Sequence, residues 1–469
     1  MQEFALFAAN LALMRRRLGL VLAAVVTAAV VTSMVPARAV SPIPIDCVGP
    51  AGDPAPGSLA WKQRDAANQY CATERLQDEH ANPAFGAAFW TESPSIYSQQ
   101  TLAMIMNPTH PHASLGQLVP GGTTTDPFRT IDRWVGAGRG RVTPVSFPSS
   151  DGAQLNGLVF EPPASVSGPY PGVVITTGSI QGYQQMYFWA AEGLAEAGYV
   201  VLTYDVQGQG NSDTLPTECS VSDCPGVPAQ QAYNFVQGAT DALDFFLSDA
   251  NPVRADVDEN HVGIAGHSLG ASAVSQDGQS DPRVKAIVAW DNLAPATGPL
   301  HAPALGINSE YFFNPTPTDA PPDPHAHDQA FTQLHAAGVD SMHIALRASM
   351  HLEYSYVPYI LPASRLGERV AFYYTLAWFD YYLRGQPDAY QRLVASSFDG
   401  SADASAIGGG TYDSAKALSN PSDPTAGNVP SVINGLPVAD RLSFYYASSY
   451  ALTAPDGGSS VCIDIRKGC

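Results

Sequence analysis

The feature that most constrains the fold is an alternation, between residues 141 and 383, of short apolar runs with longer segments of helical periodicity. Two runs separated by the turn Ser150-Asp151-Gly152 predict an opening hairpin. The later runs are continuously apolar, as expected for strands buried on both faces of a sheet. This alternation predicts an α/β fold, a doubly wound, mostly parallel central sheet with helices on both faces. The predicted strands are residues 142–147, 155–160, 172–177, 199–204, 261–265, 284–290, 303–308 and 342–346, and the predicted helices are 184–197, 231–249, 269–276, 328–337 and 365–383.

Two less regular segments flank this α/β domain, which we assign to residues 141–395. Residues 40–140 form an N-terminal extension rich in Pro, Ala and Gly, with short helices expected around 61–76 and 95–106. Residues 396–469 form a C-terminal extension, in which segments 442–452 and 461–465 suggest an added β-hairpin.

The N-terminus has the pattern of a secretory signal peptide, assigned to residues 1–39. Three arginines at 15–17 precede an apolar run over 18–31, and Ala37-Arg38-Ala39 provides small residues at a cleavage site. The run is shorter than the roughly 20 residues of a membrane-spanning helix. We therefore expect a secreted protein with no membrane span in its mature form.

The six cysteines of the chain suit an oxidising environment, where an even number indicates disulfides. The sequence does not determine their connectivity. Pairing of nearest neighbours closes the shortest loops, and it gives Cys47–Cys71, Cys219–Cys224 and Cys462–Cys469.

The charge balance excludes several classes of partner. The chain has 23 Lys and Arg against 43 Asp and Glu, a net charge of −20. Nucleic acid binding needs a concentrated basic face, so we expect none. The negative electrostatic potential that this charge creates favours neutral or cationic substrates. No Gly-x-Gly-x-x-Gly follows a first strand and no phosphate loop is present, so we expect no cofactor, and the histidine spacings indicate no metal site.

The strongest single motif is Gly266-His-Ser268-Leu-Gly270, which lies between a predicted strand and a predicted helix. Gly-x-Ser-x-Gly in this setting places a serine on a strained turn, with its hydroxyl projecting from the carboxyl edge of the sheet. Ser268 is therefore the predicted nucleophile.

From about residue 141 to 391 the chain resembles the α/β-hydrolase superfamily, and within it secreted actinobacterial serine esterases and dienelactone-hydrolase-like proteins. Besides the serine motif, the resemblance rests on residues 172–178, on the Asp-x-x-Gly-x-Gly-x-Ser turn at 205–212 and on the helix end at 378–385. It implies a catalytic triad of serine, acid and histidine in that chain order.

The residues allow a choice of partners for Ser268. His351 follows the last predicted strand and is the expected proton acceptor. Two carboxylates follow neighbouring strands, and we favour Glu310 over the alternative, Asp291, because the superfamily usually carries its acid at the later position. The oxyanion hole needs two main-chain N–H donors, expected at Leu269 and at Ser179 or Ile180.

These assignments predict a secreted serine hydrolase that cleaves carboxylic esters of small molecules or polymers through an acyl-enzyme. Tyr183 and Trp290 are the expected substrate-binding aromatic residues, because both are close to strand ends. Lipase or polyester hydrolase activity, and peptidase or acyltransferase activity, remain alternatives on the same fold. A non-catalytic secreted binding protein on a hydrolase scaffold is the alternative outside enzymes.

Overall fold

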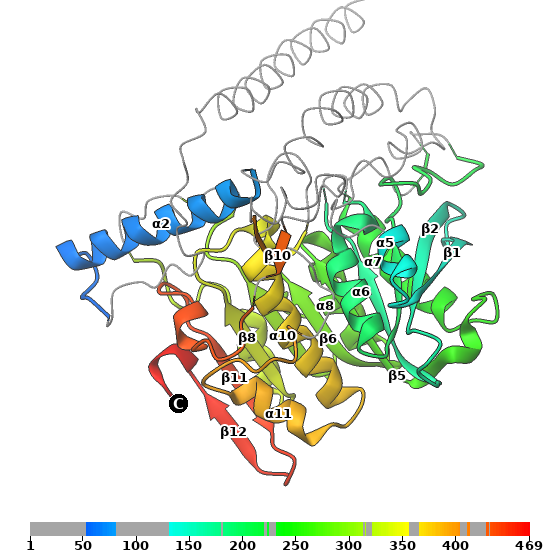
Figure 1. The fold of residues 1–469 in the computed structure, drawn as a ribbon. Coiled ribbons are helices and arrows are strands. Elements are labelled where there is room, and N and C mark those ends of the chain that lie inside the picture. Colours follow the sequence, from blue (N-terminus) through cyan, green and yellow to red (C-terminus); the bar gives the residue numbers. More distant parts are fainter. Residues whose placement is uncertain are drawn as a thin grey trace, which may run out of the picture. The chain divides into compact units, whose positions relative to one another are not determined.

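A ten-stranded mixed β-sheet organises the described part of the chain (Figure 1). The computed structural model describes residues 53–80, 131–179, 182–219, 223–224, 231–312, 315, 321–355, 365–403, 410–412, 428–430 and 432–469. The sheet and its helices confirm the predicted α/β class.

The strands follow the order β1-β2-β4-β3-β5-β6-β7-β8-β11-β12 across the sheet. The six from β3 to β8 pair in parallel, whereas β1 and β2 at one edge and β11 and β12 at the other pair antiparallel. The carboxyl ends of β5 to β8 therefore meet at one edge of the sheet, where open α/β sheets bind ligands. The strands are β1 (Arg141–Pro148), β2 (Gln154–Glu161), β3 (Tyr170–Thr176), β4 (Val200–Tyr204), β5 (Val257–His267), β6 (Val284–Trp290), β7 (Ala304–Asn308), β8 (Ser341–Ala345), β11 (Ser449–Thr453) and β12 (Ser459–Cys462).

Two hydrophobic clusters lie on the two faces of this sheet. In β3, Val173 and Ile175 belong to one cluster and Val174 to the other, as the two-residue period of a strand requires. The first cluster includes α6 (Phe188–Glu196) and α10 (Arg365–Tyr382), and the second includes α7 (Ala232–Phe246), α8 (Leu269–Ser280) and α9 (Gln329–Ala336). Two shorter helices, α5 (Ile131–Gly136) and α11 (Pro387–Val394), complete this region.

The C-terminal residues extend the main sheet. The strand expected from residue 442 begins only at Ser449, and β11 and β12 continue the main sheet beyond β8. Residues 441–443 instead lie along the end of β8 and the residues that follow it. Arg441 O accepts from Arg347 N at 2.8 Å, and Ser443 N donates to Ala345 O, in the last residue of β8, at 2.8 Å. Pairing with β11 satisfies backbone groups that β8 would otherwise leave open at a sheet edge. A small second sheet pairs β9 (Gly410–Tyr412) with β10 (Asn428–Pro430).

The N-terminal extension contributes one long described helix, α2 (Leu59–His80), which confirms the helix predicted around 61–76. The helix expected at 95–106 and the signal peptide at 1–39 lie outside the described residues. Among the helices that the structure describes, none combines the length and the apolar character needed to cross a bilayer.

Two of the predicted disulfides, Cys219–Cys224 and Cys462–Cys469, are confirmed. Cys71 is disulfide-bonded as well. The predicted Cys47–Cys71 pair cannot be compared directly, because Cys47 lies outside the described residues.

Candidate active site

Ser268 occupies a sharp turn between β5 and α8. Its backbone has φ 59° and ψ −120°, a combination that side-chain-bearing residues rarely adopt, and its N–H donates to the carbonyls of Trp290 and Asp291 at 3.1 Å each. The flanking glycines make this turn possible. A Cβ on Gly266 would lie 2.5 Å from the Gly270 carbonyl oxygen, and one on Gly270 would lie 2.4 Å from the Thr177 carbonyl oxygen. The motif is thus required by close packing of the backbone as well as by the exposure of the hydroxyl.

His351 connects Ser268 to a carboxylate. It begins the short helix η4 (His351–Tyr354), which follows β8. Its Nε2 lies 2.9 Å from Ser268 Oγ, and its Nδ1 lies 2.7 Å from Asp291 Oδ2. The three side chains come from the carboxyl ends of β5, β6 and β8 and form one continuous line of hydrogen bonds.

Asp291 is held in the charged form that this arrangement needs. Burial disfavours its charge, but the hydrogen bond and charge of His351 and the hydroxyl of Ser309 more than offset burial and hold the pKa of Asp291 below its ordinary value. Ser309 Oγ donates to Asp291 Oδ2 at 2.5 Å, and Ser309 N donates to Oδ1 at 3.3 Å. The second carboxylate oxygen is therefore also fixed.

The preference for Glu310 as the partner of His351 is wrong for this structure. The Glu310 carboxylate accepts hydrogen bonds from Asn68 Nδ2 and Ala348 N, both at 2.6 Å, and from Phe444 N at 3.2 Å. These donors occupy the carboxylate, and Asp291, the alternative named from the sequence, is the residue that contacts His351. The position of a carboxylate after a strand does not say which neighbouring segment its side chain reaches.

A second line of hydrogen bonds ends at the main chain of His351. Gly178 N donates to Tyr187 Oη at 2.8 Å, Tyr187 Oη lies 2.9 Å from His267 Nδ1, and His267 Nε2 lies 2.8 Å from the carbonyl oxygen of His351. A carbonyl only accepts, so Nε2 of His267 carries the hydrogen and Nδ1 accepts from Tyr187. Burial, with the nearby charge of His351, lowers the pKa of His267 to about 3, so this ring is neutral. Sequence reasoning gave His267 no role, since nothing in the motif shows what its ring contacts.

The expected oxyanion donors lie beside this line. Leu269 is the first residue of α8, where main-chain N–H groups lack intrahelical acceptors. Ser179 follows β3 in a turn, and its alternative, Ile180, lies outside the described residues. The buried side chain of Gln209, not anticipated from the sequence, joins the two ends of this loop. Its Nε2 donates to Gly178 O at 3.1 Å, and its Oε1 accepts from Gly182 N at 2.9 Å.

The two aromatic residues predicted to bind substrate are largely buried. Trp290 has no exposed surface, donates through Nε1 to Thr375 Oγ1 at 3.1 Å and packs 5.0 Å from the ring of Trp189. Tyr183 is 5% exposed and belongs to the same cluster. The prediction for Trp290 is therefore wrong, because its ring faces the helical layer rather than the rim. Phe312, in contrast, is 64% exposed, and its ring centroid lies 4.8 Å from that of His351.

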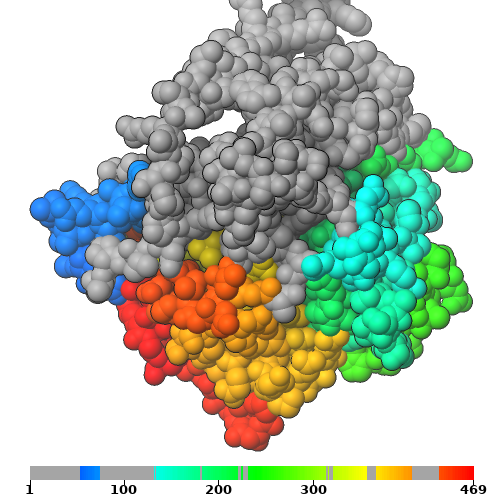
Figure 2. All heavy atoms as spheres, in the orientation of Figure 1, coloured from blue at the N-terminus to red at the C-terminus, as the bar shows by residue number. Residues whose placement is uncertain are grey.

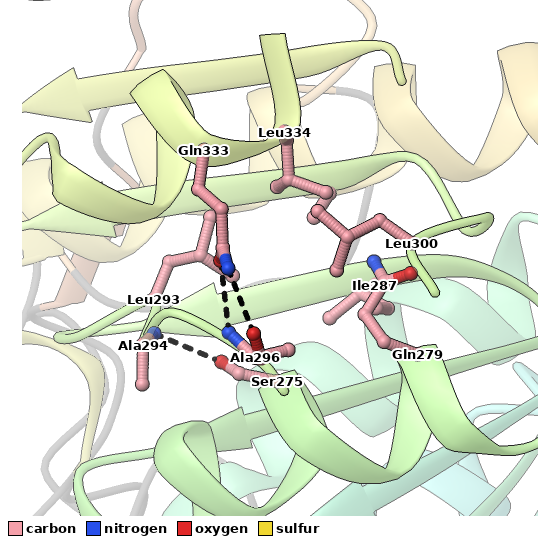
Figure 3. A pocket seen from close by; sticks show the side chains of 10 residues that line it. Ser275, Gln279, Ile287, Leu293, Ala294, Ala296, Leu300, Gln333 and Leu334 are labelled. Atoms are coloured by element: carbon pink, nitrogen blue, oxygen red, sulfur yellow. Dashed lines mark hydrogen bonds between the residues drawn. The ribbon is translucent and has the colours of Figure 1, made fainter. Parts of the chain in front are cut away.

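A separate small pocket, between α8, β6 and α9, is lined mostly by apolar side chains (Figure 3). Its polar side chains are engaged with the main chain. Ser275 Oγ accepts from Ala294 N, and Gln333 both accepts from and donates to Ala296. None of Ser268, His351 and Asp291 lines it, so we interpret it as packing space. Within the described part of the chain, no group of three His, Cys, Asp or Glu side chains could hold a metal ion.

Comparison with known proteins gives relatives that are named hydrolases. No protein-family model matches the chain. The chain is 33% identical over 167 residues to a thiohydrolase of Arthrinium phaeospermum. The matched segment covers 36% of this chain and 47% of that protein. It is 27% identical over 157 residues to a bis(hydroxyethyl) terephthalate hydrolase of Streptomyces coelicolor, covering 33% of this chain and 44% of that protein. An alpha/beta hydrolase of Xenoacremonium sinensis is 29% identical over 156 residues, covering 32% of this chain and 34% of that protein.

The likeness to these relatives supports the α/β-hydrolase superfamily for this chain. The names of its relatives support hydrolase activity and, through the Streptomyces protein, the resemblance to actinobacterial esterases. The matched segments span less than half the length of each of these relatives.

Proposed function

We propose that this protein is a secreted serine hydrolase that cleaves carboxylic esters through an acyl-enzyme. Ser268 is the nucleophile, His351 the general base and acid, and Asp291 the residue that orients His351. The observation that carries the proposal is the line of two hydrogen bonds, 2.9 Å from Ser268 Oγ to His351 Nε2 and 2.7 Å from His351 Nδ1 to Asp291 Oδ2. A serine hydroxyl is a weak nucleophile until such a base takes its proton.

The reaction follows from these contacts in two stages. Ser268 Oγ attacks the carbonyl carbon of the ester as His351 Nε2 takes the hydroxyl proton. The negative charge on the former carbonyl oxygen is stabilised by main-chain N–H groups, for which Leu269 and Ser179 are our candidates. As the tetrahedral intermediate collapses, the C–O bond to the alcohol breaks and His351 gives its proton to the leaving oxygen. Water then attacks the acyl group in the same way and releases the acid and Ser268.

The charge of Asp291 matters most while His351 is protonated. Its carboxylate accepts the Nδ1–H hydrogen bond, which fixes the tautomer with Nε2 free to accept the serine proton. The lowered pKa of Asp291 keeps this carboxylate charged at neutral pH.

Secretion is supported by the signal-like N-terminal segment and by the disulfides of the mature chain. The net charge of −20 favours neutral or cationic esters, and the exposed Phe312 ring beside His351 offers an apolar contact for them. The terephthalate ester in the name of the Streptomyces relative is a neutral aromatic ester of this kind. The Arthrinium relative is named a thiohydrolase, so we include a thioester among the substrates to be compared.

The direct test is hydrolysis of p-nitrophenyl esters by the chain from residue 40 onward. Ser268→Ala is expected to lower kcat by about 10⁶-fold, because removing the nucleophile removes the whole covalent route. Ser280→Ala, near the other end of α8, is the matched control and should retain native kcat. Undiminished turnover by Ser268→Ala, with native circular dichroism, would refute the proposal. An ester, a thioester and an amide with one acyl group then rank the substrate classes.

A further inference from the structure

The carboxylate of Glu310 joins three segments that are far apart in the sequence. Oε2 accepts from Asn68 Nδ2 on α2 and from Ala348 N in the loop before His351, both at 2.6 Å. Oε1 accepts from Phe444 N in the C-terminal segment at 3.2 Å, and the Ser443 side chain adds a further hydrogen bond. All of these partners donate, so the arrangement matches an ionised carboxylate.

The loop that receives this contact carries His351. Ala348 has a φ of 53°, in the left-handed region that a residue with a Cβ adopts only at a cost in free energy. Such a conformation persists only where the surroundings determine it. The hydrogen bond from Ala348 N to Glu310 is one such restraint, and those from His351 N to the carbonyls of Tyr311 and Phe312 are others.

Helix α2 packs against the same loop. Trp61, Cys71 and Ala72 form one buried cluster with residues of the site-bearing domain and the C-terminal segment, namely Tyr311, Ala348, Met350 and Tyr445. Tyr445 Oη donates to Asp65 Oδ1 at 2.6 Å. The surface of α2 lies beside that of the C-terminal residues (Figure 2). Asn68 is therefore the point at which this helix reaches the carboxylate beneath the histidine loop.

We propose that Glu310 and Asn68 are positioning residues for His351, so that α2 is needed for turnover and not only for folding. This inference rests on the proposed function of His351. Without the Asn68 amide, one oxygen of Glu310 loses a donor and the contact that holds Ala348 relaxes. His351, three residues later, then departs from its alignment with Ser268. Displacement of a catalytic group by about 1 Å can lower a rate by about 10²-fold.

The test compares Asn68→Ala with Gln63→Ala, an amide removed from an exposed position of the same helix. We expect Asn68→Ala to lower kcat by about 10- to 100-fold with KM little changed, because the imidazole acts on the reacting atoms and not on substrate binding. Gln63→Ala should keep native kcat. Each rate is divided by the concentration of sites that react with a fluorophosphonate, so that unfolded protein does not count, and thermal unfolding is recorded in parallel.

Asn68→Asp supplies a readout that a merely structural role would not move. A second carboxylate next to Glu310 should lower kcat further at neutral pH, because like charges at this distance repel. A proton shared by the pair restores a hydrogen bond, so the ratio of variant to native kcat should rise as the solution becomes mildly acidic. Asp65, Tyr311, Tyr445 and Arg347 also face this site, and the ratio to native protein removes their common contribution.

The two proposals fail in different ways. If Asn68→Ala keeps native kcat per reactive site, whether or not its melting temperature falls, the positioning role is overturned while the serine hydrolase stands. An equal loss of kcat in Gln63→Ala also overturns the positioning role. If the native protein neither turns over esters nor reacts with the fluorophosphonate, both proposals fall together.

Discussion

Two largely buried carboxylates at the ends of neighbouring parallel strands have different surroundings. Asp291, directly after β6, contacts the ring of His351 and the hydroxyl of Ser309. Glu310, two residues after β7, contacts an amide side chain and two main-chain N–H groups. The first is placed to stabilise a charge that appears on a neighbouring ring, and the second to hold a backbone conformation. Location at the carboxyl edge of the sheet thus identifies candidates for the triad acid. The hydrogen-bond donors around each carboxylate then show which one contacts the histidine and which one holds the backbone.

The titration behaviour of the two residues follows the same division. A cationic or hydrogen-bonded imidazole beside Asp291 holds its pKa below the ordinary value despite burial. Burial raises the pKa of Glu310, since its hydrogen-bond donors only partly offset the loss of water. Asp291 is therefore the better anion at neutral pH.

The largest difference in kcat is expected between the variants Asp291→Asn and Glu310→Gln. Asparagine keeps the shape of the side chain but loses its charge and favours the wrong imidazole tautomer, so kcat should fall by about 10⁴-fold. Glutamine at 310 disturbs only the support of the loop, and kcat should fall by about 10- to 100-fold. Steady-state kinetics on one p-nitrophenyl ester measures both. A greater loss in Glu310→Gln would reverse the two roles.

A smaller effect is expected on stability in acid, and His267 makes one contribution to it. The buried His343, with a pKa lowered to about 4, acts in the same direction, whereas the raised pKa values of Asp205 and Asp277 act against it. The His267 pKa of about 3 in the folded protein lies below the ordinary value near 6.5, so the unfolded chain binds the extra proton first. Stability should therefore fall as pH decreases between these two values, by up to about 1.4 kcal/mol per pH unit from this residue. The loss of charge on Asp291 adds to this as the pH falls through its ordinary value of about 3.9, so the upper part of the window reports His267 without Asp291.

Urea unfolding of His267→Asn at several pH values checks this prediction. The variant should show a shallower dependence on pH in that window, because asparagine does not titrate. His301→Asn, at an exposed position, is the control and should keep the native slope. An unchanged slope in His267→Asn would mean that the ring is not buried in its neutral form.

The sequence contained much of the fold because that information is local. Apolar runs and turn residues predicted β1 to β8 within a few residues, and the serine motif marked the turn between β5 and α8. The same reasoning put His351 after β8, where its ring does lie within hydrogen-bonding distance of Ser268.

What the sequence did not contain is the direction of side chains and the contacts between distant segments. Trp290 ends a strand, but only the fold shows that its ring lies under the helical layer. Residues 442–448 have the apolar character of a strand, yet part of this segment lies along the loop after β8. No pattern in a single sequence indicates that Asn68 contacts Glu310, which lies 242 positions later.

The most direct test of the central claim is the site of covalent reaction with a fluorophosphonate. The account predicts that the native protein forms one adduct, located by peptide mass spectrometry on Ser268, and that His351→Ala, which removes the base, forms it far more slowly. An unreacted native protein, or an adduct on a different serine, would contradict the account.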